Sequence, residues 1–333
     1  MKMINMKFWI RTKGTFHRSM IYATPISPPS ACNKSQYKHG RAGWAIPIME
    51  KQVYCRALVS ANWLSGALKS RPNLRVLDAT YDKDAQKQFS QRHIPKARFF
   101  DLDQCKDQTS PYEVMLPSER HFAQYVGSLG INNDSHVVVY DTDKMGMISS
   151  PRVWWMFRVF GHKNVSILDG GLQNWLKQGL LVTPENPQYG PETFRAKLDP
   201  SLLKRFEEIQ DNISSKCFQL VDARSAGRFR GPEPKPGEGI EPGHISGAVN
   251  LPFSSFLTNE GYEKSPEEIQ RMFQEKGVDL NKPMTATCRR GVTACHVALA
   301  SFILGKENTA VYDGSWSEWF HRAKPEYKVF EKN

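Results

Sequence analysis

The residues with the clearest chemical potential form one short loop, Cys-Arg-Arg-Gly-Val-Thr, at positions 288–293. Cys288 ends an apolar run, and Arg289 and Arg290 follow it directly. Two adjacent arginines are costly to bury, so this loop should face solvent or an anion. The thiolate is the nucleophilic form of cysteine, and nearby positive charge lowers the pKa of a thiol. The loop therefore predicts a nucleophilic Cys288 that acts on an anionic substrate.

The turn after the two arginines supports this interpretation. Gly291 suits a tight turn that needs a positive φ angle. The amides of Gly291, Val292 and Thr293 would then point inward as an anion-binding nest, next to the positive end of a following helix. Both features would stabilise an anionic sulfur, including a persulfide. We also expect the sulfur to be reachable from solvent.

Two other functions are alternatives for this loop. A cysteine phosphatase uses the same kind of cradle, but it needs an arginine six positions after the cysteine to fork two phosphate oxygens. Ala294 occupies that position, and Thr287 rather than a histidine precedes the cysteine. The other alternative is an ordinary buried cysteine at a strand end. The paired arginines and the glycine after them argue against it.

The segments that must position this loop occur twice along the chain. Each copy has a strand ending in Asp-Ala, a His-Ile turn, an amphipathic helix, a second strand, an apolar helix and an Asp-Gly turn. The paired ranges are 75–79 and 219–223, 92–97 and 243–248, 119–129 and 266–276, 136–141 and 284–288, 151–160 and 293–304, and 166–175 and 310–319. Strands that alternate with helices at this spacing predict parallel α/β units. The fold class is therefore α/β, with two tandem domains that each hold a small parallel sheet flanked by helices.

The informative difference between the copies is one residue. Asp141 stands where the second copy has Cys288, so only one nucleophile loop is present. We expect residues 53–181 to form a domain without a nucleophile and residues 201–333 to form the catalytic domain. Residues 182–200, rich in proline at their start, are the predicted linker. The first domain should help to shape the substrate cleft.

Several long motifs resemble the family of rhodanese (thiosulfate sulfurtransferase) and mercaptopyruvate sulfurtransferase. They are CRRGVTAC, VDARSAGRFRG, GEGIEPGHISGA, PRVWWMFRVFGH and YDGSWSEWF. The resemblance runs from Val53 to about Glu326. It implies two rhodanese-like domains and a persulfide cycle on Cys288 that needs no metal and no cofactor. The family's cyanide-detoxifying reaction would use a small anionic sulfur donor and a thiophilic acceptor.

The resemblance also implies roles for three arginines. Arg228, in GRFRG, matches the arginine that binds the anionic substrate. Arg290 matches a position that is usually lysine in the thiosulfate enzymes, so a planar fork replaces a point charge. Arg289 is expected to steer the anion from the solvent side.

Three sequence positions distinguish the thiosulfate enzymes of the family from its mercaptopyruvate enzymes. The mercaptopyruvate enzymes carry CGSGVT in the loop, an arginine where this chain has Gly237 and a histidine where it has Val114. All three positions favour a thiosulfate:cyanide or thiosulfate:thiol sulfurtransferase. The alternative within the same enzyme class is a 3-mercaptopyruvate sulfurtransferase.

The charge of the chain is concentrated at its N-terminus. The 333 residues carry 45 Lys and Arg against 34 Asp and Glu, a net charge of +11. Eight of the basic residues precede Glu50, with no acid among them, so the remaining chain has 37 basic and 34 acidic residues. Residues 1–50 are typical of a basic mitochondrial presequence, which predicts the mitochondrial matrix. A mitochondrial RNA-binding role through a basic surface is the alternative from another functional class.

The remaining sequence features concern membrane spans, the oligomeric state and the other cysteine, histidine and aspartate residues. No run of eighteen apolar residues indicates a membrane span, and the family resemblance suggests a monomer. The six cysteines show neither a disulfide framework nor metal spacing. Cys295 is expected to be a core cysteine rather than a resolving thiol, and His93 and His244 to have structural roles in turns. Asp222 is expected to pair with Arg224 and brace the Arg228 loop.

Overall fold

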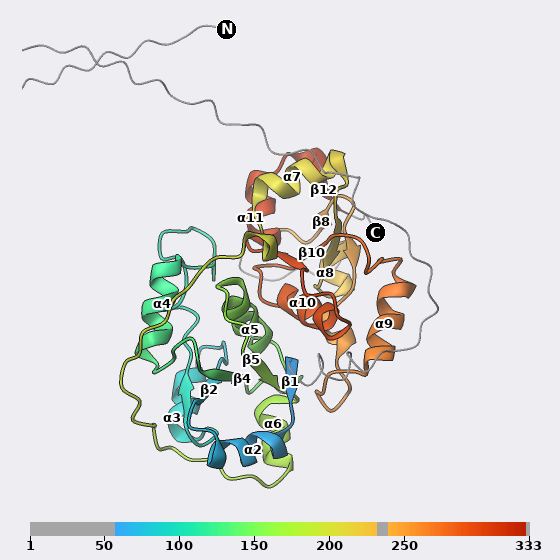
Figure 1. The fold of residues 1–333 in the computed structure, drawn as a ribbon. Coiled ribbons are helices and arrows are strands. Elements are labelled where there is room, and N and C mark those ends of the chain that lie inside the picture. Colours follow the sequence, from blue (N-terminus) through green and yellow to red (C-terminus); the bar gives the residue numbers. More distant parts are fainter. Residues whose placement is uncertain (1–56, 232–238, 331–333) are drawn as a thin grey trace, which may run out of the picture. The chain divides into compact units, whose positions relative to one another are not determined.

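The computed structural model describes residues 57–231 and 239–330. The predicted presequence at 1–50 and the substrate-discriminating Gly237 lie outside the described residues. Two five-stranded sheets dominate the described part, with the strand orders β1-β5-β4-β2-β3 and β6-β11-β10-β7-β9 (Figure 1). Neighbouring strands within both sheets are parallel. The predicted α/β class with two tandem sheet units is confirmed.

The first sheet and its helices come from the N-terminal half of the described chain. Their bounds are β1 Leu58–Val59, α2 Ala61–Ser70, β2 Leu74–Asp78, α3 Ala85–Gln91, β3 Ala97–Phe99, α4 Glu119–Ser128, β4 His136–Tyr140, α5 Ser150–Val159, β5 Val165–Leu168 and α6 Gly171–Lys177. The central strand β4 reads His-Val-Val-Val-Tyr, and its last four residues are buried. A continuous apolar run of this kind is what a parallel strand covered on both faces requires.

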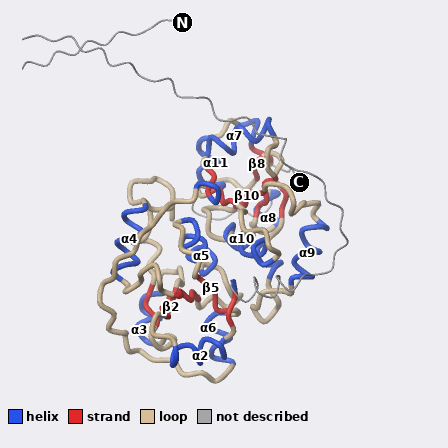
Figure 2. Tube along the Cα trace, viewed as in Figure 1, coloured by secondary structure: helices blue, strands red, loops and turns tan. Residues whose placement is uncertain are grey.

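The second half repeats this order with its own additions. Its elements are η1 Pro200–Leu202, β6 Leu203–Lys204, α7 Phe206–Ser215, β7 Gln219–Asp222, α8 Ala226–Arg230, β8 His244–Ile245, β9 Val249–Asn250, η2 Phe253–Phe256, α9 Pro266–Glu275, β10 Met284–Thr287, α10 Ala294–Ile303, β11 Ala310–Tyr312, α11 Ser315–Arg322, η3 Pro325–Tyr327 and β12 Lys328–Val329. β12 pairs with β8 in a small antiparallel sheet. Residues 178–199 contain no helix or strand and connect α6 to η1 as a long loop, drawn in tan in Figure 2. One isolated β-bridge joins Thr183 of this loop to His93.

The strand register brings the chemically interesting residues to matching sheet edges. β4 lies between β5 and β2, and β10 lies between β11 and β7. Thr287, the last residue of β10, is opposite Asp222, the last residue of β7. Ligands of open parallel sheets bind outside the carboxyl ends of the strands. Cys288 therefore starts at the edge where chemistry is expected.

The two halves share an apolar core. Helix α5 of the first half contacts helix α10 of the second, and the rings of Trp154 and Phe302 meet edge to face with their centroids 5.3 Å apart. One cluster of buried apolar residues includes side chains from both helices. Helix α10 carries buried residues along its entire length, which explains why it has no polar face. Packing of α5 against α10 thus couples the predicted catalytic loop to the first half.

Two matching polar contacts flank this core. In the first, Asp313 of the second half accepts the Leu116 amide at 2.6 Å and a guanidinium N–H of Arg152 at 2.6 Å. In the second, Asp169 of the first half accepts the Glu263 amide at 2.9 Å. The Glu263 carboxylate is 2.7 Å from Nε2 of His296, which occupies the helix position that Arg152 has in the other half. Each half therefore anchors the other through the aspartate of its Asp-Gly turn.

Candidate active site

Cys288 is fixed through its backbone to the start of α11. Its N–H donates to Oγ of Ser315 at 3.2 Å, and its carbonyl accepts the Trp316 amide at 3.0 Å. The carbonyl of Arg289 accepts the Ser317 amide at 2.9 Å. These bonds hold the first two loop residues rigidly against the next βα unit. A nucleophile needs such support because its reacting atom must be placed accurately.

The expectation that the sulfur is open to solvent is wrong for this structure. Cys288 is 2% exposed, while the side chains of Arg289 and Arg290 are 15% and 29% exposed. Both arginine side chains are thus more exposed than the cysteine that they follow.

The turn at Gly291 has the predicted geometry. Its φ is +75°, and a Cβ at this position would lie 2.6 Å from the carbonyl oxygen of Asp313. A side chain is therefore excluded both by the backbone conformation and by lack of space. The close approach of Asp313 ties the loop to the neighbouring strand end of β11.

The backbone after Gly291 leads straight into α10. Thr293 is the residue before the first helical turn, so the positive end of the helix faces the loop. Across residues 57–231 and 239–330, the hydrogen bonds give the amides of Gly291, Val292 and Thr293 no protein acceptor. Their role in holding an anionic sulfur stays a prediction.

Arg290 is the best-placed cation of the loop. Its guanidinium lies over the ring of Tyr81, 5.2 Å from the centroid, and one N–H donates to the Glu113 carboxylate. Arg289 lies 3.9 Å from the other oxygen of Glu113. Burial opposes the charge of Arg290, but Glu113 outweighs burial, so the pKa of Arg290 is raised. The first half thus supplies both a ring and a carboxylate to the catalytic loop.

Arg228 starts from the same sheet edge as Cys288. It lies in the short helix α8, which follows β7, and its carbonyl accepts the Gly243 amide at 3.1 Å. β7 is the direct neighbour of β10. The contacts that the structure describes do not join the Arg228 guanidinium to the Cys288 loop, so its substrate-binding role also stays a prediction.

The pairing of Asp222 with Arg224 is confirmed. Nη2 of Arg224 lies 2.6 Å from Oδ2 of Asp222 and donates to the Gly243 carbonyl at 2.6 Å. The guanidinium also lies 5.0 Å from the ring centroid of Trp316. Because Gly243 also bonds the backbone of Arg228, this buried pair braces the segment that carries Arg228.

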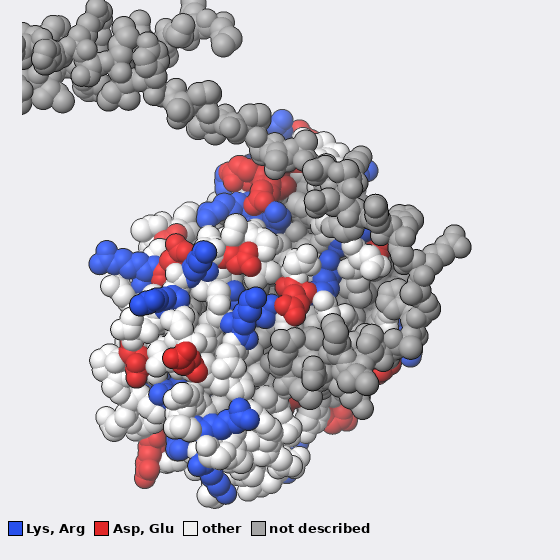
Figure 3. Space-filling model, viewed as in Figure 1, with Lys and Arg blue, Asp and Glu red and all other residues white. Residues whose placement is uncertain are grey.

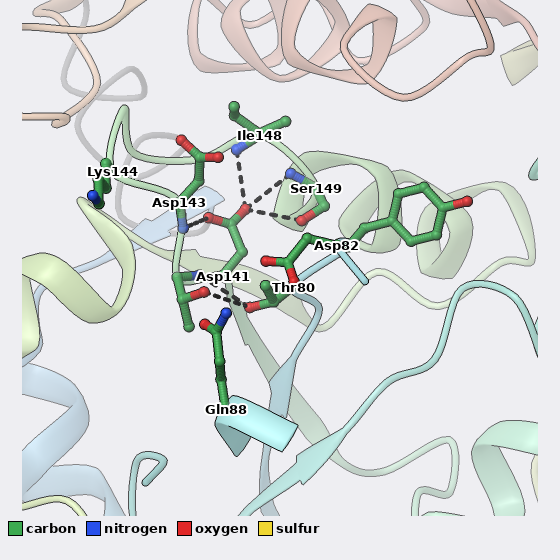
Figure 4. Close-up of a pocket in the computed structure, with 10 residues that line it drawn as sticks. Thr80, Asp82, Gln88, Asp141, Asp143, Lys144, Ile148 and Ser149 are labelled. Carbon is green, nitrogen blue, oxygen red and sulfur yellow. Dashed lines mark hydrogen bonds between the residues drawn. The ribbon is translucent and has the colours of Figure 1, made fainter. Parts of the chain in front are cut away.

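The equivalent loop of the first half holds a carboxylate in place of the sulfur. Oδ2 of Asp141 accepts the amides of Ile148, Ser149 and Ser150 at 3.0, 2.9 and 2.8 Å; Figure 4 shows the first two of these bonds. Burial raises the pKa of Asp141, and these amides act against that rise. A pocket of about 340 Å³ lies at this loop. It is lined by Thr80, Tyr81, Asp82, Gln88, Asp141, Thr142, Asp143, Lys144, Ile148 and Ser149.

Sequence reasoning missed three residues around the loop. Glu113 contacts both loop arginines, and it lies far from them in the sequence. Arg152 is fully buried, and it bonds Asp313 at 2.6 Å, the Gly291 carbonyl at 3.3 Å and the Val114 carbonyl at 2.6 Å. An arginine within an otherwise apolar helix was the available signal. Ser315 had none, because its hydroxyl meets Cys288 only after the sheet has formed.

The other candidate residues have structural surroundings. Cys295 is fully buried, its Sγ lies 3.2 Å from the Gly291 carbonyl, and burial raises its pKa. His93 and His244 stack on Phe89 and Phe229, and each bonds the carbonyl of that phenylalanine. Within the described ranges, no group of three metal-binding side chains comes together. No helix there is both long and apolar enough to cross a membrane.

Comparison with known proteins gives a consistent result. The family described as Rhodanese-like domain matches residues 60–178 and 205–322. A thiosulfate sulfurtransferase from Gallus gallus is 59% identical over 287 residues, covering 84% of this chain and 99% of the relative. A 3-mercaptopyruvate sulfurtransferase from Homo sapiens is 55% identical over 292 residues, covering 85% and 98%. The crystal structure of SseA from Escherichia coli, a 3-mercaptopyruvate sulfotransferase, superposes with a TM-score of 0.70 at 34% identity, covering 78% and 98%.

Proposed function

Because the chain belongs to the rhodanese family and is a sulfur-transferring enzyme, we propose that it moves the outer sulfur of thiosulfate to cyanide or a thiol. The proposed carrier is a persulfide on Cys288. The single observation that supports this donor most strongly is the pair of guanidinium groups directly after the cysteine, each of which faces one oxygen of the Glu113 carboxylate. Two adjacent cations suit a compact dianion.

The reaction has two displacement steps. The Cys288 thiolate attacks the outer sulfur of thiosulfate; a new S–S bond forms, the S–S bond of the donor breaks, and its electron pair leaves with sulfite. Cyanide then attacks the outer persulfide sulfur, so that thiocyanate leaves and the Cys288 thiolate returns. Both steps conserve charge, and neither needs an oxidant. This is covalent catalysis of the double-displacement type.

The loop supplies the electrostatics of both steps. Charge develops on the sulfite oxygens as they leave, and the planar fork of Arg290 can donate to two of them at once. The amides of Gly291 and Val292, with the start of α10, would stabilise the anionic persulfide between the steps. Arg228 would bind the donor from the neighbouring strand end.

A 3-mercaptopyruvate donor is the second candidate, since relatives of nearly the same identity carry either name. Val114, one of the discriminating positions, lies beside the Glu113 that contacts the loop arginines, so this position can influence the donor. The test is kcat/KM for thiocyanate formation with each donor under identical conditions. We expect thiosulfate to give the higher value. A clearly higher value with mercaptopyruvate would replace the proposal with this alternative.

For residues 1–50 we propose a mitochondrial address. A fluorescent reporter fused to these residues should enter mitochondria, and uniform distribution of the reporter would contradict the proposal. The predicted monomer and RNA-binding role stay predictions. On the face drawn in Figure 3, Lys and Arg side chains alternate with Asp and Glu rather than forming a continuous basic surface, which offers RNA binding no support there.

A further inference from the structure

Glu113 is a carboxylate that the structure places against both loop arginines. It bonds Nη1 of Arg290 through one oxygen and lies 3.9 Å from Nη2 of Arg289 through the other. These are the two cations that follow the nucleophile. The carboxylate thus presents to them the same chemistry as an oxyanion of the donor: two oxygens that share negative charge.

The backbone beside Glu113 shows that this placement is built into the fold. Val114 has a φ of +50°, a left-handed conformation that is a genuine outlier for a β-branched residue. It is 2% exposed, and its carbonyl accepts Nη2 of the buried Arg152 at 2.6 Å. Two residues later, the Leu116 amide donates to Asp313 at 2.6 Å. Strained backbone that is held by buried bonds concentrates at functional sites.

The exposures around the loop indicate which groups can move. Cys288 is 2% exposed, whereas the side chain of Glu113 is 52% exposed. A half-exposed carboxylate can turn into water at low cost, because its pairing with an arginine there is weak. The backbone at Glu113 would stay in place while its carboxylate moves between the arginines and water.

We propose that Glu113 is a built-in competitor for the donor: it pairs with Arg289 and Arg290 in the resting enzyme, and the donor's oxygens displace it. This inference rests on the proposed function, since it assigns specificity at the same site. A dianion recovers more attraction from the two guanidinium groups than a monoanion does, because Coulomb energy scales with charge. Return of the carboxylate then helps to release sulfite. Glu113 is therefore a positioning and specificity residue that acts through the arginines.

The test is steady-state kinetics of full-length Glu113→Gln with thiosulfate and cyanide. Removing the competing charge should lower both KM for thiosulfate and the inhibition constant of sulfite by about two- to fivefold. The change in kcat should be smaller, and KM for mercaptopyruvate should fall less than KM for thiosulfate. The matched control is Glu275→Gln, which removes an exposed carboxylate at the end of α9 and should leave these constants unchanged.

A double-variant cycle tests whether Glu113 acts through Arg290. In an Arg290→Gln background, Glu113→Gln should no longer lower KM to the same extent. An unchanged or raised KM in folded Glu113→Gln, or an equal effect without Arg290, would overturn the inference. If Glu113→Gln does not fold, Glu113→Asp replaces it, and its shorter side chain should also lower KM.

One added measurement separates this inference from the proposed function. The wild-type chain is treated with saturating thiosulfate, and the Cys288 peptide is weighed. If no sulfur is added, the proposed function fails and the inference fails with it. If sulfur is added but Glu113→Gln shows the wild-type dependence on thiosulfate concentration, only the inference is wrong.

Discussion

At the end of β4, the carboxylate of Asp141 accepts three amides of its own loop, whereas at the end of β10 the matching loop presents Cys288 and two arginines. Both loops leave the middle of a parallel sheet and lead into a buried helix, α5 or α10. The first loop runs from 142 to 149 and the second from 289 to 293. The scaffold thus makes the same turn twice. One copy bonds an internal carboxylate, and the other carries the sulfur that we propose gains and loses a group.

The neighbouring strand ends differ in the same way. Asp222 ends β7 and pairs with Arg224. Among the contacts described, the equivalent Asp78 at the end of β2 bonds uncharged partners: Thr80, at 3.0 Å through the amide and 2.5 Å through the hydroxyl, and Tyr140. Burial raises the pKa of Asp78 to about 6. The second half therefore balances its buried charges at the edge that carries the chemistry, and the first half does not.

The largest expected effect comes from removing the nucleophile. Cys288→Ser should reduce thiocyanate formation by about a thousandfold or more, since the proposed sulfur carrier is lost. Adding Asp141→Cys to this variant should not restore activity, because the first loop lacks the arginine pair. Activity in the double variant would show that the two loops are chemically equivalent after all. Thiocyanate is measured by colorimetry.

Breaking the polar contact next to the catalytic loop should have the next largest effect. Arg152→Met leaves Asp313 without its buried cation, which typically costs about 3–5 kcal/mol. We expect a marked fall in the urea midpoint together with weaker activity, because Arg152 also bonds the Gly291 carbonyl. Equal urea midpoints for variant and wild type would mean that this pair does not join the halves energetically.

The two strand-end aspartates should respond oppositely to neutralisation. The folded state stabilises protonated Asp78, so its contribution is complete below pH 3.8 and is lost as the pH rises through about 6. Asp78→Asn should therefore increase the free energy of unfolding at pH 8 by at most about 3 kcal/mol, and much less at pH 4. The melting temperature should rise accordingly at pH 8. Asp222→Asn should lower it at pH 8, because Arg224 loses its partner. Melting curves at both pH values test the pair, and a gain from both substitutions would contradict the comparison.

The smallest effect is expected from the second cysteine near the loop. Cys295→Ala removes a fully buried thiol whose pKa is raised by burial, so sulfur transfer should be nearly unchanged. A modest loss of stability, about 1 kcal/mol, should accompany it. Loss of turnover with retained folding would assign Cys295 a resolving role, and single-turnover release of sulfite measures that directly.

The sequence predicted the elements that repeat and the loop between them. The strand expected at 136–141 is β4 at His136–Tyr140, and the helix expected at 293–304 is α10 at Ala294–Ile303. Both have long apolar runs, which periodicity identifies well. The two-residue edge strands β1 and β6 were missed, because so short a strand carries no period and forms only against its neighbour.

The parts of the site that were missed depend on contacts between the halves. Glu113 and Arg290 are 177 positions apart, and Arg152 and Asp313 are 161 positions apart. No local pattern encodes such pairs. The burial of Cys288 depends instead on a contact within the second half, since Ser315 fixes it only after β11 has joined the sheet.

The measurement that tests the central claim most directly is the mass of each cysteine-containing peptide after the native protein has met thiosulfate and been freed of excess donor. We predict one added sulfur atom on the peptide with Cys288 and none on the peptides with the other five cysteines, Cys32, Cys55, Cys105, Cys217 and Cys295, and cyanide should remove it. Sulfur on another cysteine, or on none, would contradict the proposal that Cys288 carries the sulfur as a persulfide.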